Sequence, residues 1–254
     1  MIWVDNNQEV QKIKNTIESR YPPEKGFERK DDISNFGRYL RNLPLKPVNG
    51  LVKYYDGSVK QRNNVYSGVI DLPIGKKNLH QCADAIIRLR ADYFYKNKRY
   101  DDIHFNLTNG FLVEYTKWRE GYRVKVEGNT TTWVKKEEVS NTQEDYWKYL
   151  EFIFTYAGTL SLSKELRSIS IEEARIGDVF IRGGSPGHAI IIIDEIIDIH
   201  SKNKMYLLAQ SYMPAQELQI LNNSKVEGSW YSFEGEKTIS TPEWNFSIND
   251  LKRF

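Results

Sequence analysis

The sequence has a single cysteine, Cys82, among 254 residues. No internal disulfide can form, and a zinc site built from several cysteines is excluded. The histidines do not follow H-E-x-x-H or another metal-ligand spacing; they are His80, His104, His188 and His200. We therefore expect neither a metal ion nor an organic cofactor.

Charge of one sign and long apolar runs are also missing. Lys and Arg number 36 against 34 Asp and Glu, for a net charge of +2 without a basic block, so we expect no nucleic-acid partner. The longest apolar runs, such as Ala189–Ile193, fall far short of the roughly 20 residues of a membrane helix, so we expect no transmembrane segment. The first residues of the chain as given lack a basic, then apolar, secretory signal. A single cysteine is compatible with a cytoplasmic or a periplasmic setting.

The composition is that of a globular protein, with 40% hydrophobic and 13% aromatic residues. Repeats, low-complexity segments and linkers are not evident, so we expect residues 1–254 to form one domain with an insertion. The expected parts are N-terminal helices and a hairpin (1–75), a cysteine-bearing helix (78–98), a β-rich insertion (100–168), core strands (170–215) and an aromatic tail (216–254).

The most informative stretch runs from Ile176 to Asp194. Val179–Ile181 and Ala189–Ile193 have the apolar, β-branched composition of buried strands, and the glycines and proline between them indicate a tight turn. His188 lies where this turn meets the second strand. A titratable group at such a junction suits a general base at the mouth of a site. The alternative is a structural histidine that is hydrogen-bonded to a turn carbonyl.

A helix is predicted over Asn78 to about Lys98, with Asn78 as its N-cap. Cys82 shares an apolar helix face with Ile86 and Leu89, and it falls in or just beyond the first turn. The helix dipole at that position lowers the pKa of a thiol. The competing interpretation is that Cys82 is a small core residue, as free cysteines on such faces usually are.

Together these residues suggest a catalytic constellation. If the helix packs on the sheet, Cys82 and His188 can form a thiolate–imidazolium pair that attacks a carbonyl carbon. Gln210 ends the next apolar strand, Met205–Ala209, and its amide oxygen can orient the imidazole. The backbone N–H of Cys82 can donate to an oxyanion. Gln210 can also be a simple strand-end residue.

Other segments have weaker signals. Helical spacing predicts short helices over Asn7–Arg20 and from Ser34 to before Pro44. Asp56-Gly57 indicates a hairpin turn between Leu51–Tyr55 and a strand near Val65–Leu72. A helix capped by Thr142 and stopped near Gly158 is expected, as are the strands Ile103–Leu107 and Phe111–Tyr115. Asp84 and Asp178 are expected to be surface or turn residues rather than catalytic acids.

The segments I-E-E-A-R-I-G-D-V-F-I (171–181), G-H-A-I-I-I-I-D (187–194) and Y-L-L-A-Q-S (206–211) resemble the core of NlpC-type cell-wall peptidases, which are papain-like cysteine hydrolases. The resemblance implies an α+β fold with a cysteine-bearing helix on an antiparallel sheet. It assigns Cys82 as nucleophile, His188 as base and Gln210 as third member. The sequence departs from the pattern in reading H-Q-C-A-D-A where D-C-S-G is usual, in a long insertion after the cysteine, and in a glutamine where histidine is commoner.

Nearly the whole chain is also similar to a bacterial domain-of-unknown-function family, number 4846. The segments that carry this similarity are N-L-P-L-K-P (42–47), Q-C-A-D-A-I-I-R-L-R-A-D-Y (81–93), I-H-F-N-L-T-N-G-F (103–111), Y-A-G-T-L-S-L (156–162) and A-Q-S-Y-M-P-A-Q (209–216). That family has no activity to transfer. Its members often carry export or lipoprotein signals, so the resemblance implies a location outside the cytoplasm.

We expect a cysteine hydrolase that cleaves an amide bond, in a peptide or a peptidoglycan stem. One alternative is a catalytically silent papain-like domain that binds cell-envelope glycan or peptide in an aromatic groove. The aromatic residues for this groove, which can equally be core residues, are Trp118, Tyr122, Trp133 and Trp147. Another alternative is an acyl transferase that uses the same cysteine and histidine.

Overall fold

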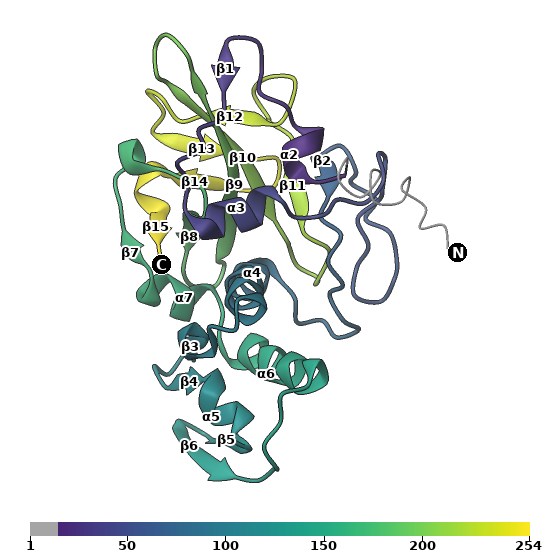
Figure 1. The fold of residues 1–254 in the computed structure, drawn as a ribbon, viewed down its shortest axis with the longest axis vertical. Helices are drawn as coiled ribbons and strands as arrows, with labels where there is room; N and C mark the ends of the chain where they lie inside the picture. Colours follow the sequence, from purple (N-terminus) through teal and green to yellow (C-terminus); the bar gives the residue numbers. More distant parts are fainter. Residues whose placement is uncertain (1–14) are drawn as a thin grey trace, which may run out of the picture.

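The computed structural model describes residues 15–254 and contains one large antiparallel sheet (Figure 1). Its nine strands are β1 (Phe27–Glu28), β2 (Tyr66–Val69), β7 (Arg167–Ser168), β8 (Val179–Arg182), β9 (His188–Asp198), β10 (Lys204–Gln210), β11 (Gln219–Leu221), β12 (Trp230–Ser232) and β15 (Leu251–Arg253). They run in the order β2-β11-β10-β9-β8-β15-β7, with β1 beside β9 and β12 beside β10. Six helices accompany the sheet within residues 15–254, so the fold is α+β, as the sequence predicts.

The three central strands pair in chain order, as their apolar runs predict. β8 and β10 are the antiparallel neighbours of β9. Side chains of β9 alternate between the two faces of the sheet. Ala189 and Ile191 join the main core with the helices, whereas Ile190 and Ile192 join a second core with Phe246 of the C-terminal tail. The sheet therefore separates a helical layer from a tail layer.

Helix α4 (Cys82–Lys96) lies in the helical layer and carries the cysteine. It begins at Cys82 with Gln81 as N-cap, so the predicted start at Asn78 is wrong. Asp84 accepts a hydrogen bond from the backbone N–H of Gln81 (2.9 Å) and fixes the first turn here. The Asn78 side chain instead accepts from the backbone N–H of Ala215 (2.8 Å). Asn78 thus ties the approach to α4 to the loop after β10.

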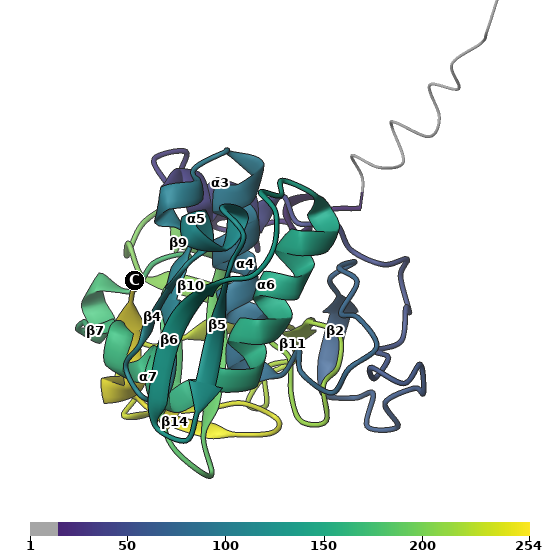
Figure 2. The same cartoon turned by 90° about the horizontal axis from the view of Figure 1, so that it is seen from below.

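The segment between α4 and β7 forms a layer of its own below the sheet in Figure 1. Its α-helices are α5 (Tyr115–Arg119), α6 (Gln143–Tyr156) and α7 (Thr159–Glu165), and its strands form the hairpins β3–β4 (His104–Asn106, Leu112–Glu114) and β5–β6 (Tyr122–Glu127, Thr130–Lys135). Thr142 caps α6 as predicted, by accepting from the backbone N–H of Asp145 (3.1 Å). Helix α6 lies beside α4 in both views (Figures 1 and 2).

The N-terminal part differs more from expectation. Helix α2 (Ile17–Arg20) begins at Ile17 with Thr16 as its N-cap, so the helix predicted over Asn7–Arg20 is wrong at positions 15 and 16; positions 7–14 lie outside the described residues. Helix α3 (Asn35–Arg41) is capped by Ser34 as predicted. The turn at Asp56-Gly57 closes only an isolated bridge between Lys53 and Val59, and β2 pairs with β11 instead. A turn signal fixes the turn but not how far the flanking segments pair.

The C-terminal tail is part of the sheet and of its second core. β12 and β15 add to the sheet, and the hairpin β13–β14 (Thr238–Ser240, Asn245–Ser247) lies on it. Phe233 and Phe246 contact Phe180 of β8, with ring centroids 5.2 and 6.0 Å apart. This confirms that the tail packs on the body. Within residues 15–254, no helix has the length and apolar character needed to cross a membrane.

Candidate active site

The three predicted site residues occupy the ends of three neighbouring elements. Cys82 is the first residue of α4, His188 is the first residue of β9, and Gln210 is the last residue of β10. All three side chains are buried, with 6%, 2% and 1% of their surface exposed. The apolar runs of the strands and the first turn of the helix therefore position polar groups inside the protein.

His188 and Gln210 are joined directly. Nε2 of His188 lies 2.8 Å from Oε1 of Gln210. Gln210 in turn donates from its Nε2 to the carboxylate of Glu243 (2.7 Å), which also accepts from Nζ of Lys60 (2.8 Å). Because a carboxylate only accepts hydrogen bonds, the amide nitrogen of Gln210 must face Glu243 and its oxygen must face His188. The imidazole then carries its proton on Nε2, and Nδ1 keeps the lone pair.

Aromatic rings surround His188. The ring centroids of Tyr212, Trp244 and Phe246 lie 4.8, 5.4 and 5.8 Å from that of the imidazole. Burial lowers the pKa of His188 to about 4; the hydrogen bond with Gln210 opposes this change, and the charge of Lys60 adds to it. The imidazole is therefore neutral near pH 7, which corrects the expected imidazolium.

Backbone N–H groups also act on the thiol of Cys82. Those of Ala83, Ala189 and Cys82 each lower the pKa of this thiol. Burial has the larger effect and raises this pKa to about 11, and the charge of Asp84 adds to the increase. The predicted net lowering by the helix dipole is therefore wrong, because desolvation of the thiolate outweighs the N–H groups.

The structure brings the thiol next to the His188 strand but does not join it to the imidazole. The backbone N–H of Ala189 lowers the pKa of the thiol, and among residues 15–254 no hydrogen bond joins Cys82 to His188. Strand alternation explains this, because Ala189 faces the helical layer while the His188 ring packs against Trp244 and Phe246 of the tail layer. The thiol and the imidazole are thus both neutral, and both lie near the start of β9.

A cavity of about 300 Å³ opens beside the thiol. Its walls come from the start of α4, the end of α6, the start of α7 and the turn before β9; the lining residues include Asn78, Cys82, Asp84, Phe154, Thr159 and Pro186. Its volume suits a short stretch of peptide or another small molecule.

Asp84 supplies the carboxyl group of this cavity. It is only 5% exposed, and its Oδ1 has no hydrogen-bond partner among the described residues. Burial raises the pKa of its carboxyl to about 8. Asp178 is also buried, at 1% exposed, and pairs with Arg253 (2.6 Å). The burial of Asp84 in the first turn of a helix corrects the expected surface or turn position. Asp178, although buried, closes the turn that starts at Arg175, as predicted, because its backbone N–H donates to the carbonyl of Arg175 (3.1 Å).

Sequence reasoning missed Glu243, which orients Gln210, and Lys60, which pairs with Glu243. Neither residue lies in a recognisable motif, and each comes from a loop far along the chain from β10. Asp84 had a usable signal, because an acidic residue at the third helical position often closes a capping box. Within residues 15–254, no cluster of three or more His, Cys, Asp or Glu side chains can hold a metal ion.

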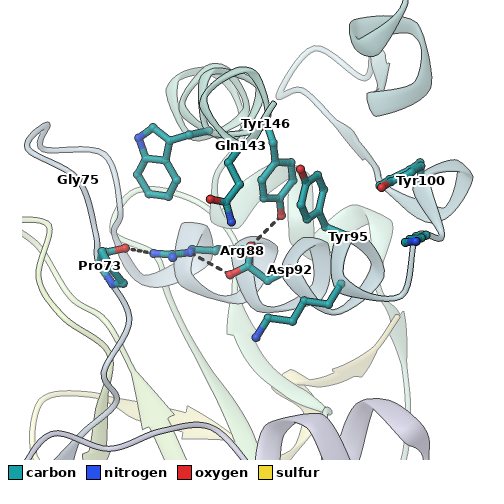
Figure 3. A pocket seen from close by; sticks show the side chains of 11 residues that line it. Pro73, Gly75, Arg88, Asp92, Tyr95, Tyr100, Gln143 and Tyr146 are labelled. Carbon is teal, nitrogen blue, oxygen red and sulfur yellow. Dashed lines mark hydrogen bonds and ion pairs between the residues drawn. The ribbon is translucent and has the colours of Figure 1, made fainter. Parts of the chain in front are cut away.

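The predicted aromatic groove does not form as one surface. Trp118 is buried in the core against Tyr149, with centroids 5.7 Å apart, and Trp133 packs on Phe111. Trp147 lines a second cavity, which lies between α4 and α6 (Figure 3), and the other three residues do not line it. The groove hypothesis therefore reduces to that cavity.

Comparison with known proteins gives a family but no activity. Among curated proteins and among solved structures, none matches the chain. A family model described as a domain of unknown function (4846) matches residues 17–253, a range that contains every site residue from Lys60 to Glu243. The protein is therefore a member of this domain-of-unknown-function family.

Proposed function

We propose that the protein is a cysteine hydrolase with a papain-like, NlpC-like core, which cleaves an amide bond through Cys82, His188 and Gln210. The observation that carries the proposal is the hydrogen-bond chain from Lys60 through Glu243 and Gln210 to His188. A chain of three buried polar residues and the partly buried Glu243, which fixes one imidazole tautomer, is costly to build for packing alone. It is what a general base requires.

In the proposed reaction, Nδ1 of His188 takes the proton from the Cys82 thiol as the sulfur attacks the carbonyl carbon of the substrate. The backbone N–H of Cys82 or Ala83 can donate to the oxygen that becomes negative in the tetrahedral intermediate. The C–N bond then breaks, and the leaving amine takes the proton from the imidazole. Water, activated by the same nitrogen, hydrolyses the thioester and restores the thiol. Gln210 holds Nε2–H throughout.

In the absence of substrate, the proton rests on sulfur, because burial disfavours both the thiolate and the imidazolium. Activation must come from the substrate. The positive charge of an amino group in the cavity, next to Cys82 and the Asp84 carboxyl, would stabilise the thiolate and so lower the pKa of the thiol. The proposed substrate is therefore a peptide, or a peptidoglycan stem, with a free amino group near the scissile bond, and the proposed location is outside the cytoplasm.

One observation favours a second candidate, a catalytically silent domain that binds a cell-envelope peptide or glycan. The raised pKa of Cys82 and the lowered pKa of His188 describe a resting pair without the charges of an active thiolate. In this case the cavity beside Cys82 holds a ligand and the thiol is only part of its wall.

Alkylation of Cys82 separates the two candidates. Because the chain has one cysteine, iodoacetamide uptake needs no correction for other thiols. In a hydrolase, Cys82 of the folded protein should react with iodoacetamide at pH 7, and it should react faster when a short peptide with a free amino terminus is bound. The His188→Ala variant should lose most of this reactivity. The matched control, His104→Ala, removes an exposed histidine from strand β3 and should change nothing.

Peptide cleavage completes the test. A mixture of short peptides with free or acetylated amino termini should be cleaved by the protein and by His104→Ala, but not by Cys82→Ala. A thiol that reacts at the same rate in the native protein and in His188→Ala, together with no cleavage, would leave the silent binding domain as the function.

A further inference from the structure

A second cavity, of about 600 Å³, lies further along α4 and is separate from the thiol. Figure 3 shows Arg88 and Asp92 of α4 on one side, Gln143 and Tyr146 of α6 on the other, and the loop with Pro73 and Gly75 at one end. At about 1.5 Å per residue, Arg88 and Asp92 lie roughly 9 and 15 Å along the helix axis from Cys82. The site described above therefore does not include this cavity.

The floor of the cavity is held in place by Arg88. This side chain is 7% exposed, donates to the carbonyl of Pro73, and donates from Nε to Asp92 (3.3 Å). Its guanidinium lies 4.9 Å from the ring centroid of Trp147. Its Nη2 has no hydrogen-bond partner within residues 15–254. A buried, fixed guanidinium with a free donor is a suitable anchor for a carboxylate or a phosphate.

Aromatic rings form preorganised walls. Trp147 donates from its indole nitrogen to Glu151 (3.1 Å), which fixes the ring plane. Tyr95 and Tyr146 are stacked with centroids 4.1 Å apart, and the Tyr146 hydroxyl donates to Asp92 (2.8 Å). Aromatic faces held in this way gain from stacking on another flat ring without a rearrangement of the site.

The charges around the cavity favour an anion. Arg88, Lys96 and Lys98 line it, against a single carboxylate, Asp92. Both oxygens of Asp92 already accept hydrogen bonds, from Arg88 and Tyr146, so they offer little to a cationic ligand. Among the described residues that line the cavity, Gln143 is the only uncharged polar side chain that is not aromatic. This favours an aromatic ring over a sugar, which needs many neutral hydrogen-bond partners.

We propose that this cavity binds an aromatic anion, a planar ring that carries a carboxylate or a phosphate. The ring lies against Trp147 and Tyr95, and the anionic group lies at Arg88. The two lysines attract the anion through their charge over a longer range. The proposal does not depend on the chemistry of Cys82. Its binding energy combines stacking with electrostatic attraction, so the affinity should fall as salt rises.

Isothermal titration calorimetry with four probes tests the proposal. AMP and benzoate contain both parts of the ligand, adenosine lacks the anion, and glucuronate lacks the aromatic ring. AMP or benzoate should bind with an affinity about tenfold above that of adenosine and of glucuronate. Absence of saturable binding of both AMP and benzoate, at concentrations up to about 10 mM, overturns the proposal. Glucuronate that binds as well as AMP overturns the choice of an aromatic ring.

Variants locate the binding. Lys96→Ala/Lys98→Ala removes two exposed charges and should weaken binding about tenfold, whereas the matched control Lys25→Ala/Lys30→Ala should not change it. Both pairs are exposed, so folding is not at risk. Trp147→Leu should also weaken binding about tenfold, and Cys82→Ala should leave it unchanged. If the probe binds the Lys96→Ala/Lys98→Ala variant and the Trp147→Leu variant as tightly as the unaltered protein, it binds elsewhere. That result overturns the assignment.

Discussion

Helix α4 has a cavity at each end, and the two cavities have opposite character. The cavity at its start is lined by a buried carboxyl, Asp84, and by the thiol of Cys82, and no Lys or Arg lies among its described lining residues. The cavity near its end is lined by three cationic side chains and four aromatic rings. Acids at a helix start and bases at its end both suit the helix dipole. The dipole therefore explains the signs of the charges.

The two ends of α4 also differ in how far their ionisable groups are buried, which the helix dipole does not explain. Asp84 is 5% exposed and has an unpartnered oxygen, whereas Lys96 and Lys98 are exposed to solvent. A desolvated carboxyl changes its protonation with its surroundings, and a solvated ammonium group keeps its charge. The start of α4 is thus arranged for chemistry that responds to a ligand, and its end for recognition of charge. The two ends of α4 should therefore act independently.

The largest expected effect is the loss of peptide cleavage when the tautomer of His188 is no longer fixed. Glu243→Ala removes the acceptor that orients Gln210, so the amide can turn and the imidazole can shift its proton to Nδ1. Cleavage of the peptide substrate should fall about tenfold to a hundredfold, because a base in the wrong tautomer cannot accept the thiol proton. Long-range ¹H–¹⁵N correlation spectra should show the Nε2–H tautomer in the unaltered protein and a mixture in the variant. AMP binding at the other end of α4 should not change.

Lys60→Met is the control for this experiment. It breaks the same buried ion pair but keeps Glu243 as the acceptor for Gln210. It should lower stability and leave the tautomer of His188 unchanged. An Nδ1–H tautomer in the unaltered protein would contradict the proposed orientation of the hydrogen-bond chain.

How far the sequence predicts this site depends on the range of the interactions. The apolar runs before Gln210 and after His188 predicted adjacent antiparallel strands, and the structure confirms that pairing. Glu243 could not be found in this way, because it reaches Gln210 from a loop 33 residues further along the chain. Helix periodicity located Cys82, but its first turn is set by Asp84, while Asn78 bonds to the loop after β10.

Protonation states were the least predictable property. The position of Cys82 at a helix start favours a low pKa, and only the tertiary structure shows that desolvation reverses the sign. The side of the sheet that the His188 ring faces also depends on the tertiary structure. The sequence places His188 where a turn meets a buried strand, but which layer its ring faces depends on where α4 and the tail pack.

Asp84→Asn should activate the thiol. The negative charge of Asp84 raises the pKa of Cys82, so its removal should lower that pKa and increase alkylation at pH 8 to 9 about tenfold, the change in thiolate for one pKa unit. Burial should still keep the pKa of the Cys82 thiol above its ordinary value in this variant. Asp101→Asn, an exposed change near the other end of α4, is the control. Slower alkylation in Asp84→Asn would mean that the capping bond to Gln81, and not the charge, governs the thiol.

The same variant predicts a pH dependence of stability. Asp84 keeps its proton in the folded state up to about pH 8, whereas the unfolded chain releases it near pH 4. Between these values the folded state binds more protons, so this group lowers the free energy of unfolding as pH rises. Asp84→Asn should therefore gain stability relative to the unaltered protein from pH 4 to 8, by up to about 1.4 kcal/mol per pH unit.

Urea unfolding of both proteins at pH 5, 6, 7 and 8 measures this difference. His188 acts in the opposite direction, because its pKa of about 4 in the folded state lies below the unfolded value near 6.5, so its contribution to stability rises with pH over that range. Both proteins contain His188, and its contribution cancels in the difference. A difference in stability that does not change with pH would show that Asp84 is ionised in the folded state throughout.

The smallest expected effect is at the aromatic end of α4. Gly75 has φ +77° and, in Gly75→Ala, the new Cβ would lie 2.8 Å from Cζ2 of Trp147, so the indole must move. Gly57 is the matched control, because it has φ +86° and nothing within 4 Å of an added Cβ. Each alanine should cost about 1–2 kcal/mol of stability for its left-handed backbone.

Gly75→Ala alone should also weaken AMP binding, about threefold to tenfold, because stacking depends on the position of the ring. Alkylation of Cys82 should be the same in both glycine variants. If Gly75→Ala and Gly57→Ala bind AMP equally, Trp147 is not a wall of the binding site. If Gly75→Ala also changes the thiol, the two cavities are coupled through the packing of α4 against α6, and the independence of the two ends of α4 is wrong.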